Sequence, residues 1–120
     1  DETVALQMLS HRDTLLPSIR KEVRNAHTIF QDWAQQEKRI EYVQPDGGVT
    51  CCIRIPGAPG DKMQSLSSLL NTRYRTAVGP GHWFKLPPNY MRIGFGWTRA
   101  EDTRDALRCV SSAITDTFGE

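Results

Sequence analysis

The stretch YMRIGFGWTRAEDTRDAL, residues 90–107, joins a strand pattern to a helix pattern, and this combination decides the fold class. Along its first six residues the side chains alternate, which places Met91, Ile93 and Phe95 on one face of a strand, and we assign that face to the core. After the strand, apolar side chains recur every three or four residues, which predicts an amphipathic helix that ends near Gly119. The stretch therefore indicates a sheet with a helix packed on its apolar face.

The predicted helix begins at a capping-box sequence. Thr98 can accept a hydrogen bond from a backbone N–H of the first turn, and Glu101 can reach back to the cap. The residues that we expect on the buried side of this helix are Ala100, Thr103, Leu107, Val110 and Ile114.

A longer helical pattern occupies the first third of the chain. Its apolar stripe consists of Leu16, Ile19, Val23, Ala26, Phe30 and Trp33. Pro17 lies inside this pattern and lacks a backbone N–H, so we expect a kink or a fresh helix start there. The apolar residues before it, Val4, Leu6, Met8 and Leu9, form a second and less regular helical pattern.

Between these two helical regions the sequence predicts strands and one short helix. Strand candidates are residues 40–43, 49–55 and 74–78, and residues 61–71 form a short amphipathic helix. The first two strands are separated by QPDGG, which carries a turn signal. The order of elements predicts a two-layer α+β domain with a long N-terminal helix, a three- to four-stranded sheet and helices packed on one face.

Composition places the chain among ordinary globular domains. It has 120 residues, 38% hydrophobic and 24% charged, which suits a single modest core. A net charge of +1 does not suggest binding to nucleic acid or to an anionic membrane, and no apolar run approaches the roughly 18 residues of a membrane span. Adjacent Cys51 and Cys52 suit reduced thiols, so we expect a cytoplasmic protein. Because the chain opens with Asp1, we expect a processed form or a fragment of a longer protein.

No segment makes a self-sufficient catalytic or metal site. His11, His27 and His82 are scattered over separate elements, which does not fit zinc-ligand spacing. GFGWTR, residues 94–99, resembles half of a dinucleotide-binding fingerprint, but glycines that allow close backbone packing explain it better. The same aromatic strand also suggests an RNA-recognition module, a rival interpretation that the nearly neutral charge disfavours.

Arg92 is the candidate binding residue. Strand alternation puts it on the face away from the core together with Gly94, which leaves space above the sheet for a small group. A guanidinium in such a place favours a bidentate carboxylate or phosphate partner. An ion pair with one of the chain's own 14 acidic side chains is the other possibility, and the sequence leaves both open.

Four segments, in this order, resemble the C-terminal small domain of class I/II (fold-type I) aminotransferases, which use pyridoxal 5′-phosphate (PLP). LPSIRKEVRNAHTIF looks like the family's helix between its large and small domains, and QPDGGVTCCIRIP looks like its P-x-G-G turn and strand. TAVGPGHWF is similar to its V-x-P-G-x-x-F loop, with Pro80, Gly81 and Phe84 in register. YMRIGFGWTRAEDTRDAL is similar to its I/M-R-I/L-G-F strand and the helix that follows.

The resemblance implies roles for three residues. Arg92 stands where the family places the arginine that binds the α-carboxylate of the amino acid or 2-oxo acid substrate. Gly47 and Gly48 would let the backbone approach the substrate. The family commonly has an aromatic residue after this turn, whereas Val49 and Thr50 follow it here, so the substrate preference is not implied.

The resemblance also implies what lies outside this chain. The family's PLP-binding lysine belongs to the large domain, and Lys21, Lys38, Lys62 and Lys85 match no such motif. We therefore expect residues 1–16 to be an inter-domain segment and 17–120 the small domain, with no cofactor and no activity on this chain alone. PLP would bind the missing large domain of an intact, homodimeric enzyme. The alternative is a non-catalytic α+β binding or interaction module with Arg92 in a structural ion pair.

Overall fold

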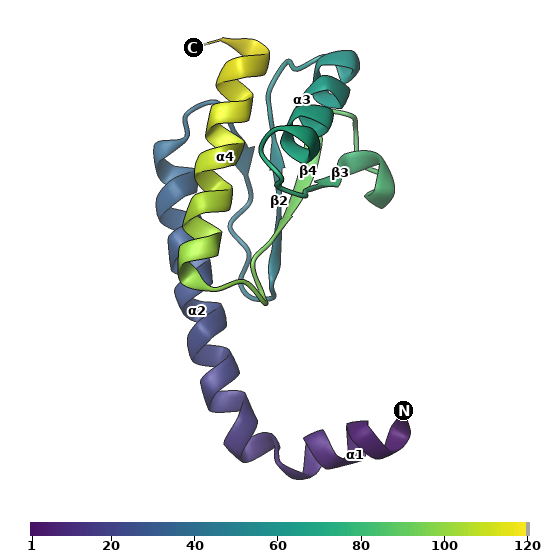
Figure 1. Ribbon diagram of the computed structural model, residues 1–120, viewed down its shortest axis with the longest axis vertical. Helices are drawn as coiled ribbons and strands as arrows, with labels where there is room; N and C mark the ends of the chain where they lie inside the picture. The colour runs from purple at the N-terminus through teal and green to yellow at the C-terminus, as the bar shows by residue number, and fades with distance from the viewer. Residues whose placement is uncertain (120) are drawn as a thin grey trace.

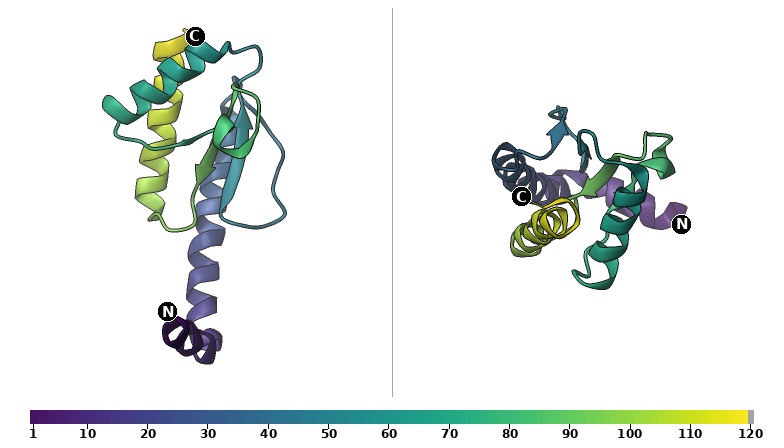
Figure 2. Two further views of the ribbon diagram at one scale, coloured as in Figure 1. Left: turned by 90° about the vertical axis from the view of Figure 1, so that its right-hand side faces the viewer. Right: turned by 90° about the horizontal axis from the view of Figure 1, so that it is seen from above.

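A computed structural model, which describes residues 1–119, shows an α+β architecture (Figure 1). One antiparallel sheet has the strand order β1-β2-β4-β3, and α2, α3 and α4 cover one of its faces (Figure 2). This confirms the predicted fold class. The helices are α1 (Glu2–Ser10), α2 (Arg12–Gln36), α3 (Gly60–Thr72) and α4 (Ala100–Phe118), with a 3₁₀ helix η1 (Gly81–Phe84). The strands are β1 (Glu41–Tyr42), β2 (Thr50–Arg54), β3 (Gly79–Pro80) and β4 (Tyr90–Gly94).

The core lies between the helices and one face of the sheet, as the alternation in β4 predicts. Met91, Ile93 and Phe95 are buried there, whereas Arg92 and Gly94 are exposed on the opposite face. The ring of Phe30 from α2 stacks on that of Phe95, with 5.4 Å between their centroids. The long helix and the central strand are therefore joined by a direct aromatic contact.

Helix α4 buries the predicted side but does not begin with a capping box. Its N-cap is Arg99, which makes no side-chain capping bond. The Thr98 hydroxyl instead lies 2.6 Å from the hydroxyl of the buried Thr103. Because the helix begins at Ala100, Thr98 lies one position too early to cap it, and the capping-box prediction is wrong. Thr103, Leu107, Val110 and Ile114 are buried as predicted, together with Ala113.

The break in the N-terminal helical region occurs at His11, and Pro17 lies inside α2 rather than at a helix start. The apolar stripe of α2 divides into two parts. Phe30 is fully buried, whereas 36% of Leu16 and 46% of Ile19 are exposed, because the first half of α2 projects beyond the sheet (Figure 2). Together with α1, this half forms an arm that makes the molecule elongated, 50 × 28 × 27 Å.

The strand expected at residues 74–78 does not form, and β3 begins only at Gly79. The chain after α3 instead curls back on the end of that helix. The backbone N–H groups of Tyr74 and Thr76 bond to carbonyls at the end of α3, and Arg75 between them has a positive φ of 49°. These local bonds to α3 replace the bonds that a strand would make to a sheet.

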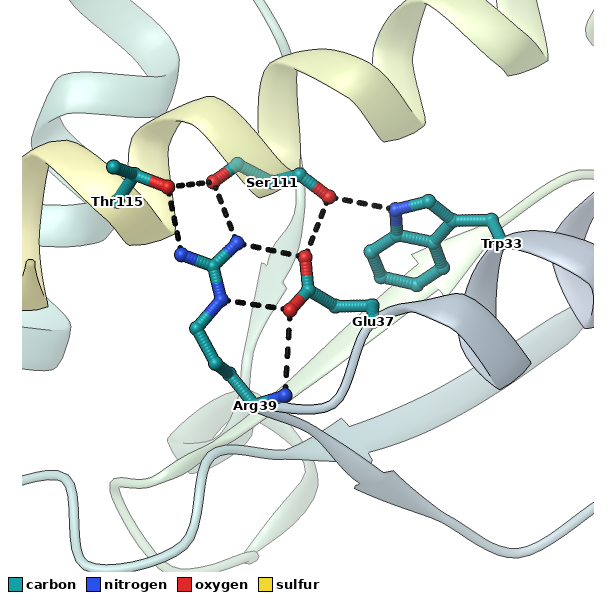
Figure 3. Close-up of polar contacts among 5 residues, drawn as sticks. All are labelled: Trp33, Glu37, Arg39, Ser111 and Thr115. Atoms are coloured by element: carbon teal, nitrogen blue, oxygen red, sulfur yellow. Dashed lines mark hydrogen bonds and ion pairs between the residues drawn. The ribbon is translucent and has the colours of Figure 1, made fainter. Parts of the chain in front are cut away.

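A polar network joins the end of α2 to α4 (Figure 3). The Arg39 guanidinium donates to both carboxylate oxygens of Glu37, at 2.7 and 2.8 Å, and to the Thr115 hydroxyl. The Ser111 hydroxyl donates to Glu37 and accepts the indole N–H of Trp33. The hydrogen bonds from Arg39 lower the pKa of Glu37 from 4.5 to about 2, although burial opposes this. Glu37 is therefore an ionised, buried anchor between the two helices.

No helix among the described residues is long and apolar enough to cross a membrane.

Candidate functional site

The outer face of the sheet, opposite the helices, carries Arg92 at its centre. In the register of the sheet, Arg92 lies between Cys52 of β2 and Gly79 of β3. Gly79 has no side chain, and the ring of Phe84 occupies the vacant place: a Cβ at residue 79 would lie 2.9 Å from Phe84 Cε2. The turn of η1 after β3 thus folds an aromatic ring back over the strand beside Arg92.

Arg92 stacks on this ring. Its guanidinium carbon lies 3.9 Å from the centroid of Phe84, within the range of a cation–π contact. Within residues 1–119 the guanidinium makes no hydrogen bond and no ion pair. By contrast, Arg54 on the same face is bonded to the carboxylate of Glu41. The intramolecular ion pair considered for Arg92 is therefore not found in the described chain.

The space above Gly94 is filled by Trp97. A Cβ at residue 94 would lie 3.2 Å from Cη2 of the indole, so the six-membered ring lies over Gly94 on the outer face of the sheet. The indole is nevertheless 78% exposed. Gly94 thus makes room for a side chain of this protein, whereas the sequence suggested room for a ligand.

Gly96 allows a second close contact at the same end of the sheet. A Cβ there would lie only 2.4 Å from Cβ of Val49, and the N–H of Phe95 donates to the Val49 carbonyl at 2.9 Å. The two glycines of GFGWTR therefore serve close packing, as the sequence analysis favoured over a dinucleotide fingerprint.

Gly47 and Gly48 lie in the loop before β2, at the end of the sheet marked by Gly94. Gly48 has φ of +90°, a conformation that favours glycine, and no other atoms lie within 4 Å of a Cβ built at either position. The cross-strand neighbours of Arg92 are other residues, Cys52 and Gly79. The structure thus places the two glycines beside open space at the strand end and Arg92 near the middle of the face.

The roles of Phe84 and Trp97 were not identified from the sequence. Phe84 belongs to the V-x-P-G-x-x-F motif, but the motif alone does not show that its ring supports Arg92. Trp97 follows a strand end, and nothing in its spacing indicates that the indole folds back over Gly94. Both contacts depend on glycines, and a glycine's neighbours become known only from the fold.

The described residues offer neither a metal cluster nor an enclosed lysine. No group of three or more His, Cys, Asp or Glu side chains in residues 1–119 could hold a metal ion. Burial raises the pKa of Cys51 to about 11, which keeps this thiol protonated. All four lysines, Lys21, Lys38, Lys62 and Lys85, are exposed.

No protein-family model and no curated protein matches this sequence. Solved structures do match it. A PLP-dependent aminotransferase from Streptococcus suis superposes with a TM-score of 0.85 at 23% identity, over 100% of this chain and 31% of that one. The chain has the fold of one part of PLP-dependent aminotransferases. At the level of the fold, this confirms the resemblance to PLP-dependent aminotransferases that was inferred from the four sequence segments.

Two further structures share this aminotransferase-like fold. The PLP-dependent cyclase OrfR matches with a TM-score of 0.82 at 27% identity, over 96% of this chain and 31% of its own. LysN, an α-aminoadipate aminotransferase from Thermus thermophilus, matches with 0.76 at 18% identity, over 95% of this chain and 30% of its own. The chain thus spans less than a third of the length of each of these structures. Because a cyclase is among them, the fold by itself does not fix the reaction.

Proposed function

We propose that this chain is the small domain of a PLP-dependent aminotransferase and that Arg92 binds the α-carboxylate of its amino acid or 2-oxo acid substrate. The observation that carries the proposal is the state of Arg92. It is a cation on an open sheet face, held on an aromatic ring and without an acidic partner in residues 1–119. The fold supports the assignment, because the chain matches an aminotransferase over its whole length.

The contact with Phe84 suits Arg92 to this role. A guanidinium is planar and carries its N–H donors along its edges, so a ring against one face leaves the edges free to bind a carboxylate in a bidentate way. The ring also restricts the side chain, which lowers the entropy lost when a ligand binds. Arg92 would hold and orient the substrate and would not transfer a proton.

The residues of this chain do not fit PLP. The cofactor supplies an electron sink for reactions at the carbon next to the amino group, and it is held covalently by a lysine. Such a lysine works when desolvated, whereas all four lysines here are exposed, and the Lys38 ammonium group donates a hydrogen bond to the Gln35 carbonyl. The cofactor would bind a large domain outside these residues, and this chain alone would not transfer amino groups.

Other parts of the chain have proposed places in the intact enzyme. Residues 1–16 would connect to the large domain, and residues 17–120 would form the small domain. Gly47 and Gly48, with open space around them, would let the backbone approach the substrate. The intact enzyme would be a homodimer.

The test uses the intact protein that contains this chain, loaded with PLP. Arg92→Lys keeps the positive charge but lacks the two parallel N–H donors of the guanidinium edge. We therefore expect the variant to bind propionate, a substrate-like inhibitor, roughly 10- to 100-fold more weakly. Arg54→Lys is the matched control, because this arginine lies on the same face but is paired with Glu41. Equal propionate affinity in wild type and Arg92→Lys would overturn the role of Arg92. Amino-group transfer by the wild type separates the enzyme from a carboxylate-binding module without catalysis.

A further inference from the structure

The outer face beside Arg92 carries an unusual side chain. Trp97 is 78% exposed, yet its six-membered ring lies over Gly94. A large aromatic side chain left in water offers apolar area that a ligand can cover favourably. Trp97 therefore places aromatic surface over Gly94, two residues along β4 from Arg92.

The spacing between the two groups suits one small ligand. Arg92 and Gly94 are two residues apart on the same face of β4, so their backbones are about 6.8 Å apart. A carboxylic acid held by the Arg92 guanidinium would bring its side chain near the indole over Gly94. The distance is of the same order as the length of an amino acid from its carboxylate to the end of its side chain.

Apolar groups lie on the sheet side of Trp97, whereas Glu22, Asn25 and Arg99 lie with it around a neighbouring cavity. Thr50, the cross-strand partner of Gly94, turns its methyl carbon toward that position, 3.9 Å from a Cβ built there. Val49 is 38% exposed and packs on Gly96 at the same end of the sheet. The other arginine of this face, Arg54, is already bonded to Glu41, so a second carboxylate would have to compete with Glu41 for it.

We propose that Trp97 is a specificity-determining residue that packs against the substrate's side chain, and that the preferred substrates carry an apolar or aromatic side chain rather than an acidic one. This inference rests on the proposed function, because it takes the substrate carboxylate to be bound at Arg92. Gly94 is part of this arrangement, because a methyl group at that position would lie 3.2 Å from Trp97 Cη2 and would push the indole away from its place on the sheet by a few tenths of an ångström.

The test compares two probes that differ by one phenyl ring, propionate and 3-phenylpropionate, and calorimetry on the intact protein measures their dissociation constants. We expect 3-phenylpropionate to bind more tightly in the wild type. Trp97→Ala is expected to reduce this preference about 3- to 10-fold, the value of an aromatic contact, and to leave propionate unchanged. Trp97→Phe should retain most of the preference. Trp83→Ala, which removes another exposed tryptophan (68%), is the matched control and should retain all of it.

A second variant tests the same geometry without removing the indole. Gly94→Ala places a methyl group 3.2 Å from Trp97 Cη2 and should reduce the preference in the same direction. If the Trp97→Ala variant does not fold, Gly94→Ala tests the role of the indole in its place.

The outcomes separate the two proposals. If Arg92→Lys weakens both probes equally while Trp97→Ala and Gly94→Ala leave their ratio unchanged, the role of Trp97 is overturned and that of Arg92 stands. If Arg92→Lys weakens neither probe, the proposed function fails as well. Tighter binding of succinate than of 3-phenylpropionate would overturn the predicted substrate class.

Discussion

The guanidinium carbon of Arg92 lies 3.9 Å from the ring centroid of Phe84, and Phe84 in turn occupies the place that a side chain at Gly79 would take. Strand, loop and glycine together thus hold the one arginine that we propose binds substrate. The contact is cation–π in character, and in exposed places such contacts contribute about 0.5–1 kcal/mol.

Removal of the Phe84 ring should therefore weaken carboxylate binding without abolishing it. For Phe84→Leu we expect about 2- to 5-fold weaker binding of propionate, because Arg92 loses its support but keeps its charge. Phe84→Tyr should bind like the wild type. Gly79→Ala should resemble Phe84→Leu, because its methyl group displaces the ring. Unchanged affinity in both Phe84→Leu and Gly79→Ala would show that the ring does not position Arg92.

Glu37 should make stability depend on pH in the acid range. Its pKa is lowered in the folded state, so its contribution to the free energy of unfolding is present above about pH 4.5 and is lost as the pH falls toward 2. The shift corresponds to about 3 kcal/mol. Urea unfolding at several pH values, followed by tryptophan fluorescence, measures this loss.

Glu37→Gln is the control for this pH dependence. The variant should be less stable than the wild type at pH 7 and should lose less stability between pH 4.5 and 2, because the titrating carboxylate is gone. Identical acid profiles for the two proteins would assign the pH dependence to other groups.

Close packing between Gly96 and Val49 should be sensitive to one added methyl group. A Cβ at residue 96 would lie 2.4 Å from Val49 Cβ, so Gly96→Ala should destabilise the protein by about 1–3 kcal/mol. Val49→Ala does not relieve this clash, because it retains Cβ, whereas Val49→Gly removes it. In a double-mutant cycle, the pair Gly96→Ala and Val49→Gly should therefore cost less than the sum of the single changes. Simple additivity would show that the strain lies elsewhere.

The two halves of α2 should respond differently to truncation in the isolated chain of 120 residues. Phe30→Ala removes a fully buried ring and should cost about 3–5 kcal/mol. Ile19→Ala changes a side chain that is 46% exposed and should cost about 0.5 kcal/mol or less. Denaturant unfolding of the two variants measures the difference. Similar costs would mean that the arm is covered, for example by a second copy of the chain, which sedimentation would detect.

The fold class could be predicted because two patterns in the sequence are strong, the alternation of a strand and the three- and four-residue spacing of an amphipathic helix. The alternation around Arg92 correctly separated the buried Met91, Ile93 and Phe95 from the outer face, and the heptad-like spacing of α4 identified most of its buried side. Where the prediction failed, local hydrogen bonds decided the outcome. Thr98 bonded to Thr103 instead of capping α4, and the bonds of Tyr74 to α3 replaced a strand.

The candidate site was predictable only in part. The position of Arg92 on the open face followed from alternation, and the resemblance suggested its role. Its support by Phe84 and the position of Trp97 over Gly94 did not follow, because both depend on what fills the space above Gly79 and Gly94. In both contacts a side chain from outside the strands folds over a glycine on the outer face of the sheet. No spacing of residues along the chain predicts such a contact.

Because only one half of α2 packs on the sheet, a small change in the angle of this helix moves its far end by a large distance. Its second half is fixed to the sheet through the contact of Phe30 with Phe95, and its first half extends beyond the sheet. The free half, about 14 residues long, measures about 20 Å at 1.5 Å per residue. A tilt of about 5° between the sheet and whatever holds the far end would move that end by about 2 Å. If Arg92 binds the substrate carboxylate as we propose, a shift of this size between the sheet and whatever holds the far end of α2 would make or break its hydrogen bonds.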